Sequence, residues 1–430
     1  MRLRSPYDRE ILLLAVPALG ALAAEPLYIL VDTAIVGHLG TPQLAALALA
    51  GALLSAVATL CNFLTYGVTA QVARLHGAGE VGRAAAVAPQ ALWVAGTIGV
   101  IVAALTAALA APAISALGGH GEIGRMATSF LRIGALGLPF ALIALAGQGY
   151  LRGTSDLRTP LLIVVAANLL NVVLEVLFIY GFDWGLNGSA WGTVVAQAAM
   201  GGAFIVALLR APAPSRRPDR ALIRPLLRMG GPLIVRTGSL LAAFVLASAV
   251  LARVGEASLG AHQIAFQLFI FIALVLDAIA IAGQVIVGRR LGAGDAAGAR
   301  AAARRMIELS VAAGVVFALL LLALIDVIPH AFTDDPAVIE RAQALWPLFA
   351  LMQPIGAAVF ALDGILLGAG EADYLAWSML AAFVCFLPFA LAGLEWGVTA
   401  VWVGLNVLML VRLATCGVRF AGGRWQRVGV

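Results

Sequence analysis

The chain has 430 residues, of which 62% are hydrophobic and only 11% are charged. A soluble domain carries about 25% charged residues, so this composition indicates a membrane protein with many spans and excludes a soluble globular protein. The three cysteines all lie in apolar stretches, and we expect no disulfide framework. The net charge of +5 follows from where the arginines lie and does not indicate nucleic-acid binding.

Hydropathy, with Gly, Pro and charge clusters taken as breaks, predicts an all-α membrane protein with twelve transmembrane helices and no soluble domain. The first ten residues are too polar for a cleavable signal peptide. In chain order the predicted helices span about 11–37, 44–66, 84–111, 126–148, 159–181, 185–209, 226–252, 258–286, 299–328, 337–365, 372–393 and 396–416.

The arginines predict the orientation, because the chain contains no lysine. With a cytoplasmic N-terminus, the termini and inner loops hold 22 of the 27 arginines, Arg412 among them. The outer loops then hold only Arg125, Arg253 and Arg341. The positive-inside rule therefore predicts that both termini are cytoplasmic. We expect a multi-pass protein of the inner (plasma) membrane, in contact with the lipid bilayer and monomeric.

Several features recur at a constant distance of 215 residues, such as Pro17 and Pro232, or Gly77 and Gly292. A fixed register across several loops indicates an internal duplication. Each half has six spans, an even number, so the halves are expected to be parallel repeats related by a pseudo-two-fold axis along the membrane normal. We predict two six-helix bundles: an N-lobe over 1–209, a cytoplasmic linker over 210–225 and a C-lobe over 226–430. Such an architecture is typical of transporters rather than of membrane enzymes.

Acidic and polar residues inside the predicted spans of the first half indicate a functional site. Ionisable residues within a membrane are costly and are functional candidates. Two carboxylates in a low dielectric cannot both stay charged without a cation or proton between them. The spacing therefore predicts a coupling site for H⁺ or Na⁺ at one depth, and separate hydrogen bonds to nearby backbone are the alternative. Its predicted members are Asp32, Asn171, Glu175 and Thr193.

The second half carries different charges, at a depth nearer the cytoplasmic side. Arg236, Asp277 and Asp363 indicate an ion-pair network, which is either a static brace or part of an inner gate. We favour the brace, because leaving one buried charge unpaired costs several kcal/mol. Glu25 and Arg132 are further intramembrane charges whose depths permit pairing.

Two prolines predict a bend in the first helix, since Pro17 and Pro26 each remove a backbone hydrogen bond. The five histidines show no ligand spacing, so no structural metal is expected. A P-loop needs a lysine, which this chain lacks, so the chain alone is not an ATP-driven pump. We expect no cofactor beyond the coupling ion.

These motifs resemble the multidrug and toxic compound extrusion (MATE) transporters, and in particular their DinF branch. The resemblance covers almost the whole chain. Its markers are the segment Pro26–Gly37 around Asp32, the loop Gly77–Glu80, and the segment Gly149–Pro160. The DinF pattern is matched by Arg236-Thr237, Asp277 and Asp363-Gly364.

The resemblance implies a secondary active antiporter that exports amphiphilic or cationic organic compounds by alternating access, coupled to H⁺ or Na⁺ influx. It places the cation-binding network on the four N-lobe residues named above. The sequence departs from related prokaryotic members at Glu175, where they have Asp. A lipid-linked-precursor flippase and a major-facilitator carrier are the alternatives within transporters, and a membrane-embedded enzyme is the alternative from another class.

Overall fold

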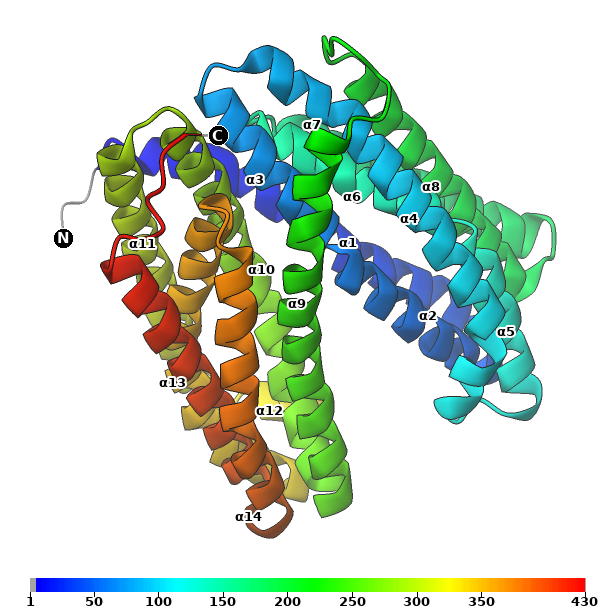
Figure 1. The fold of residues 1–430 in the computed structure, drawn as a ribbon. Coiled ribbons are helices and arrows are strands. Elements are labelled where there is room, and N and C mark those ends of the chain that lie inside the picture. Colours follow the sequence, from blue (N-terminus) through cyan, green and yellow to red (C-terminus); the bar gives the residue numbers. More distant parts are fainter. Residues whose placement is uncertain (1–4, 430) are drawn as a thin grey trace. The chain divides into compact units, whose positions relative to one another are not determined.

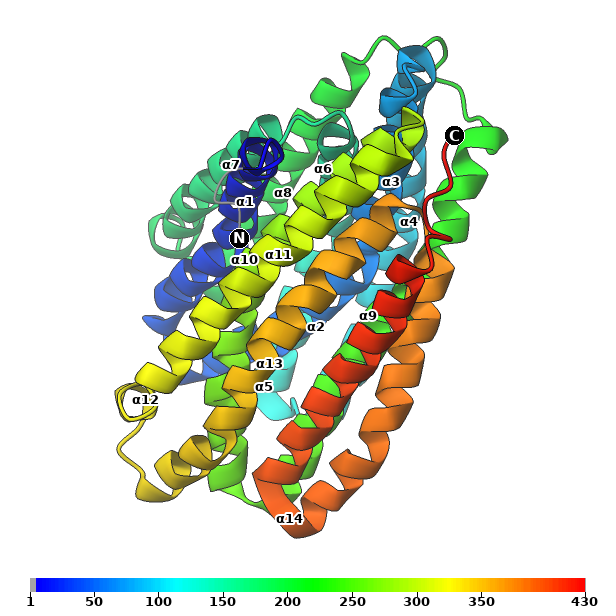
Figure 2. The ribbon, with the colours of Figure 1, turned by 90° about the vertical axis from the view of Figure 1, so that its left-hand side faces the viewer.

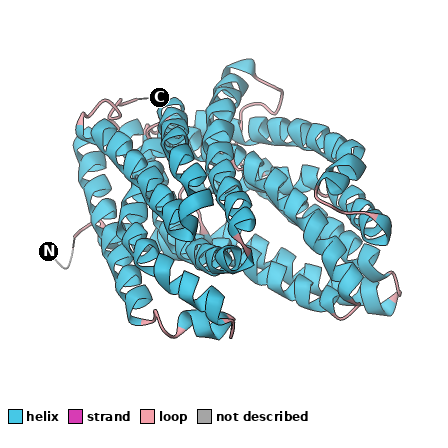
Figure 3. Ribbon diagram, turned by 90° about the horizontal axis from the view of Figure 1, so that it is seen from below, coloured by secondary structure: helices cyan, strands magenta, loops and turns pink. Residues whose placement is uncertain are grey.

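The structure is a computed structural model that describes residues 5–429. Within these residues all regular secondary structure is helical, as Figure 3 shows. Ten segments of the described chain are long and apolar enough to cross a membrane, and the pair α5 (Gly121–Ala135) and α6 (Leu138–Gly153), bent by 49°, makes an eleventh. Gly397 has a non-helical backbone and divides α14 (Ala372–Ala421) into two spans. The twelve predicted spans are therefore confirmed.

Contacts between residues divide the chain into two compact units. The N-terminal unit is Gly20–Gly230, coloured blue to green in Figure 1. Its helices are the larger part of α1 (Asp8–Gly37), α2 (Thr41–Cys61), α3 (Phe63–Gly77), α4 (Val81–Ala116), α5, α6, α7 (Arg158–Val176), the short π-helix η1 (Leu177–Gly181) and α8 (Gly185–Leu209).

The C-terminal unit runs from Gly231 onward and also includes the described residues up to Leu19. Figure 2 shows α13 (Pro336–Gly368) between α11 (Ala296–Ala323) and α14. Large side chains such as Trp346, Phe349 and Trp402 are fully buried in the core of this unit. Its helices are most of α9 (Arg220–Val254), α10 (Glu256–Gly292), α11 (Ala296–Ala323), α12 (Ile328–Phe332), α13 (Pro336–Gly368) and α14.

The first turns of α1 are fixed to the C-terminal unit by charge-assisted hydrogen bonds. Asp8 accepts from Nε and Nη2 of Arg305 at 2.6 and 3.0 Å. Glu10 forms ion pairs with Arg289 and Arg290. Such two-pronged pairs between arginine and carboxylate are geometrically specific, so they hold the start of α1 in a defined place.

Beside this cluster, Asp295 caps the N-terminus of α11 in the short loop after α10. The backbone N–H of Gly298 and the guanidinium of Arg290 both donate to the Asp295 carboxylate. These bonds, the one to Gly298 above all, hold the pKa of Asp295 below its usual range. The carboxylate therefore stays charged at neutral pH and stabilises the positive end of the α11 dipole.

The start of α9 belongs to the opposite unit from the rest of its helix, as the start of α1 does. Its residues up to Gly230 belong to the N-terminal unit, where Leu226 is 5% exposed and packs near Phe63 and Gly67. The two helices change unit close to the repeat-related residues Pro17 and Pro232. Each unit therefore contains the beginning of the other half's first helix, an exchange that hydropathy does not indicate.

Several predicted helix bounds differ from the structure. α9 begins at Arg220, inside the predicted linker, because Asp219 accepts the backbone N–H of Ala221 there and caps the helix start. α1 is a single helix through Pro17 and Pro26, and the predicted bend stays a prediction. The predicted fourth span is broken between Ala135 and Leu138.

Candidate functional site

Three helices of the N-terminal unit each contribute two polar side chains that are four residues apart. In an α-helix this spacing places both side chains on one face, one turn above the other. The three pairs therefore form two layers, and hydrogen bonds connect the members within each layer. The pairs are Tyr28 and Asp32 on α1, Asn171 and Glu175 on α7, and Ser189 and Thr193 on α8.

The first layer joins two carboxyl groups through one hydroxyl. Ser189 Oγ lies 2.9 Å from Asp32 Oδ1 and 2.9 Å from Glu175 Oε1. All three residues are buried: Asp32 is 8% exposed, and Glu175 and Ser189 are fully buried. Asp32 and Glu175 were both predicted members of the site, whereas Ser189 was not. Its position four residues before Thr193 on the same helix is the signal that could have identified it.

The second layer lies one helical turn away. Asn171 Nδ2 donates to Thr193 Oγ1 at 3.3 Å, and Tyr28 Oη lies 3.1 Å from the same oxygen. The structure thus brings Asn171 and Thr193 together, as the sequence predicts, and adds Tyr28. The functional role of the two layers stays a prediction.

A single serine proton constrains the charge of the first layer. A hydroxyl has one O–H donor, so Ser189 can donate to only one of the two carboxyl groups. If both were ionised, the other contact would set a hydroxyl oxygen against a carboxylate oxygen in a buried site. A proton on one carboxyl removes this conflict, because the protonated group donates to Ser189 Oγ. The arrangement is suited to holding one proton between two acids.

Two buried oxygens of the site make no hydrogen bond within residues 5–429. They are Glu175 Oε2 and Asn171 Oδ1, which belong to the same face of α7. Carboxylate and amide oxygens are the ligands that hard cations prefer. A proton on Glu175 or a small cation beside both residues would satisfy these atoms.

A cavity of about 410 Å³ reaches the site from one side. Glu25, Tyr28, Asp32 and Thr193 line it, but Glu175 does not. Most of the other lining residues are apolar side chains from α2, α5 and α6. Asp32 therefore lies between the cavity and Glu175, which is fully buried and does not line the cavity.

Close packing of α8 on α7 and on the following η1 depends on two glycines. A Cβ at Gly188 would lie 2.8 Å from the backbone carbon of Phe178, and one at Gly192 would lie 3.2–3.3 Å from Glu175. Glycines four residues apart let membrane helices approach closely. Phe178 belongs to the π-turn η1, and such turns often occur at functional sites.

Gly192→Ala is expected to displace Glu175 and to slow transport without abolishing it. Overpacking costs about 1–3 kcal/mol, which exceeds the roughly 0.5–1 kcal/mol that replacing a helical glycine gains. We expect a lower melting temperature and reduced efflux in vesicles. Gly202→Ala on the same helix is the control, because nothing lies within 4 Å of its Cβ position, and it should raise the melting temperature. Equal behaviour of the two variants would contradict the close contact at Gly192.

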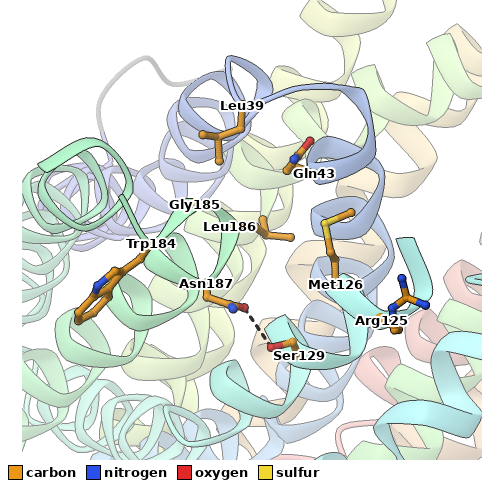
Figure 4. Close-up of a pocket in the computed structure, with 9 residues that line it drawn as sticks. All are labelled: Leu39, Gln43, Arg125, Met126, Ser129, Trp184, Gly185, Leu186 and Asn187. Carbon is orange, nitrogen blue, oxygen red and sulfur yellow. Dashed lines mark hydrogen bonds between the residues drawn. The ribbon is translucent and has the colours of Figure 1, made fainter. Parts of the chain in front are cut away.

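A second pocket, of about 350 Å³, lies beside the start of α8 and is lined by residues of α5 and of the α1–α2 connection. Figure 4 shows Ser129 of α5 and Asn187 of α8 meeting across it, where the Ser129 hydroxyl donates to Asn187 Oδ1 at 3.1 Å. Asn187 precedes Ser189 by two residues, so this bond helps to position the start of α8. Asp32 and Glu175 do not line this pocket.

In the C-terminal unit, Asp363 is the centre of a buried charge network. Arg236 Nη2 donates to Asp363 Oδ2 at 2.7 Å, which confirms the predicted ion pair. Arg412 donates to the same oxygen and is only 2% exposed. Arg412 was counted with the arginines of the termini and inner loops, but it lies within α14, where a buried carboxylate compensates its charge. The side of the membrane on which it lies stays a prediction.

The other intramembrane charges predicted from the sequence are Asp277, Glu25 and Arg132. Asp277 is half-buried on α10. Glu25 is exposed and lines the 410 Å³ cavity, and Arg132 is exposed on α5. No ion pair joins Glu25 to Arg132 in the described part of the chain, so that pairing was wrong.

The match to a known protein family occurs twice, once in each half of the chain. The MatE family model matches residues 17–177 and again residues 232–392. Both bounds of the second match lie 215 residues after those of the first, so the family unit is one half of this chain.

Individual relatives match across nearly the whole chain. Protein DETOXIFICATION 44 (chloroplastic) of Arabidopsis thaliana is 32% identical, over 94% of this chain and 80% of the relative. DNA damage-inducible protein F of Escherichia coli (strain K12) is 27% identical, over 94% of this chain and 90% of the relative. A crystal structure of MATE in the bent conformation has the same fold, with a TM-score of 0.88 at 20% identity over 98% of this chain and 95% of that one. The chain therefore belongs to the MATE family, whose members are multidrug and toxic compound efflux transporters and not enzymes.

Proposed function

We propose that this protein is a secondary antiporter that exports organic compounds in exchange for protons. The observation that carries this proposal is the Ser189 hydroxyl placed 2.9 Å from both Asp32 and Glu175. One exchangeable proton lets the two carboxyl groups and the Ser189 hydroxyl all form hydrogen bonds. Loss of that proton leaves both buried carboxylates charged. That change in charge is large enough to favour a different arrangement of the helices.

The cavity supports the substrate class. A pocket of about 410 Å³ falls within the ~300–1,000 Å³ of small-molecule sites, and apolar walls with few polar groups suit amphiphilic compounds. Its two acidic residues, Glu25 and Asp32, favour a cationic ligand. Because Asp32 belongs to both the cavity and the proton site, a cation in the cavity and a proton on the acids would compete for the same negative charge.

Na⁺ is the second candidate for the coupling ion. The buried oxygens Glu175 Oε2 and Asn171 Oδ1 favour it, because both are able to bind a hard cation. A bound Na⁺ would neutralise the two carboxylates as a proton does, so the coupling logic is the same. The two ions differ in an experiment that supplies one gradient at a time.

We further propose that the protein lies in the inner (plasma) membrane with both termini cytoplasmic, and that it acts as a monomer. An even number of spans places the termini on one side, and the arginine distribution favours the cytoplasm. No cofactor is needed in this proposal beyond the coupling ion.

Transport in vesicles of purified protein tests the function. Ethidium, an amphiphilic cation, is loaded and its efflux is followed under a proton gradient without Na⁺, under a Na⁺ gradient at equal pH, and without a gradient. We expect efflux with the proton gradient alone. Efflux only with the Na⁺ gradient would assign the coupling to Na⁺. Movement of a fluorescent lipid-linked precursor, with no efflux of a panel of amphiphilic cations, would instead indicate a flippase.

A further inference from the structure

A separate cavity of the N-terminal unit has about 790 Å³ and almost entirely apolar walls. Side chains of α4, α6 and α8 line it. Trp93, Val100 and Ile101 are 53–60% exposed, so the cavity is a groove that opens on the surface of the unit. None of the residues of the proposed coupling site lines it.

The groove exists because its floor is built from small or ring-shaped residues. Gly96 has no side chain, and nothing lies within 4 Å of the position that its Cβ would occupy. Pro89 and Pro139 contribute compact rings. Farther along α4, a Cβ at Gly99 would lie 2.6 Å from Pro139 Cα, so α4 and α6 touch there. The open space at Gly96 thus lies beside a tight helix contact.

The length of the groove matches one leaflet of a bilayer. Its lining residues on α4 run from Pro89 to Ile101, which corresponds to about 18 Å of helix. Half of the hydrocarbon core of a bilayer is about 15 Å thick. An extended acyl chain therefore fits along the groove from end to end.

A single positive charge marks one end. Arg216, in the segment between α8 and α9, is the one charged side chain among the described residues that line the groove. Its Nη2 donates to the carbonyl of Leu209 at 3.0 Å, which uses one of the five N–H donors of a guanidinium. The indole of Trp93 donates to the Arg216 carbonyl at 3.0 Å. Tryptophan and arginine together are typical of the boundary between hydrocarbon and headgroups.

The segment that carries Arg216 is fixed in place by a buried amide. Gln90 on α4 is 1% exposed, donates to the Arg217 carbonyl at 2.9 Å and accepts from the Asp219 backbone N–H at 2.8 Å. Satisfying both ends of a buried amide makes this contact specific. The segment therefore presents Arg216 at the end of the groove rather than as a free surface charge.

We propose that this groove binds an anionic phospholipid, with the phosphate against Arg216 and an acyl chain along the lining residues of α4 as far as Ile101. The apolar walls provide the site for the chain, and Arg216 provides the charge that distinguishes an anionic headgroup from a zwitterionic one. The ligand is a resident lipid and not the transported compound, because the groove is separate from the cavity that Asp32 lines.

Quenching of Trp93 fluorescence by lipids with brominated acyl chains tests this proposal. The full chain is reconstituted with phosphatidylcholine, and brominated phosphatidylglycerol or brominated phosphatidylcholine is added in increasing fraction. The difference between the wild type and Trp93→Phe isolates the Trp93 signal. We expect phosphatidylglycerol to quench it at a roughly fivefold lower lipid fraction, the factor that one basic residue contributes beside anionic lipid. Equal quenching of this signal by the two lipids overturns the proposal.

Two pairs of variants separate the headgroup from the chain. Arg216→Gln should abolish the preference for phosphatidylglycerol, whereas Arg217→Gln, the same change one residue away, should keep it. Gly96→Leu fills the open space and should reduce quenching by both lipids, whereas Gly417→Leu on α14, also with nothing within 4 Å, should not. Loss of the preference in Arg217→Gln, or unchanged quenching in Gly96→Leu, overturns the proposal.

Discussion

Asp32→Asn is expected to reduce gradient-driven efflux to the level of empty vesicles while the protein remains folded. The amide has nearly the same shape as the carboxyl group and keeps a hydrogen-bonding oxygen beside Ser189, so packing is preserved. It cannot gain or lose a proton, and Glu175 then remains as the one acid in contact with Ser189. Without a pair of acids, proton binding no longer changes the charge balance that we propose as the coupling step.

The measurement compares ethidium efflux by the wild type, Asp32→Asn and Asp334→Asn under each gradient. Asp334 lies in the exposed segment before α13, so the same chemical change there should leave efflux unaltered. Equal melting temperatures would show that the loss in Asp32→Asn is not a loss of fold. Transport by Asp32→Asn at the wild-type rate would show that Asp32 does not couple, and Glu25→Gln would be the next variant to measure.

Asp363→Asn should be the most destabilising single change in the C-terminal charge network. Asp363 accepts from both Arg236 and Arg412, so neutralising it leaves Arg412 buried without its carboxylate. Removing one partner of a buried ion pair costs about 3–5 kcal/mol. Arg236→Gln should cost much less, because Arg412 continues to neutralise Asp363.

Melting temperatures and folded yield in detergent measure this difference. The double variant Asp363→Asn with Arg412→Leu should recover part of the loss, since the buried positive charge is removed together with its partner. This expectation differs from a simple two-residue pair, in which removing Arg236 alone would isolate the acid. If Arg236→Gln is as damaging as Asp363→Asn, Arg412 does not share the charge of Asp363 in the folded protein.

The duplication and the number of spans were predictable because both are periodic features of the chain. The 215-residue offset requires only that the same turn-forming residues recur, and the MatE model repeats at the same offset. The two acids were predictable because a carboxyl group within an apolar run is rare. Ser189 and Tyr28 were missed because hydroxyl groups are common in apolar helices, and only their spacing of four residues from Thr193 and Asp32 sets them apart.

The ion-pair partner of Arg412 was not predictable from hydropathy. The predicted span 396–416 already contains Arg412, but hydropathy does not show that a carboxylate from another helix compensates its charge within the protein. Asp363 is far from Arg412 in sequence, and only the packing of α13 on α14 brings them together. Likewise, nothing in the local sequence of α1 shows that its first turns pack with α10 and α11 through Asp8 and Glu10.

The exchanged starts of α1 and α9 limit how such a fold can be divided or assembled. Cutting the chain between α8 and α9 would not release two complete bundles, because each fragment would carry a segment that packs in the other. Two such fragments, produced together, would hold each other through these segments. A chain the length of one repeat could complete its bundle only if it exchanged the start of its first helix with a second copy. Such an exchange is domain swapping. Fusion of two such chains end to end would place both exchanged segments within one covalent chain.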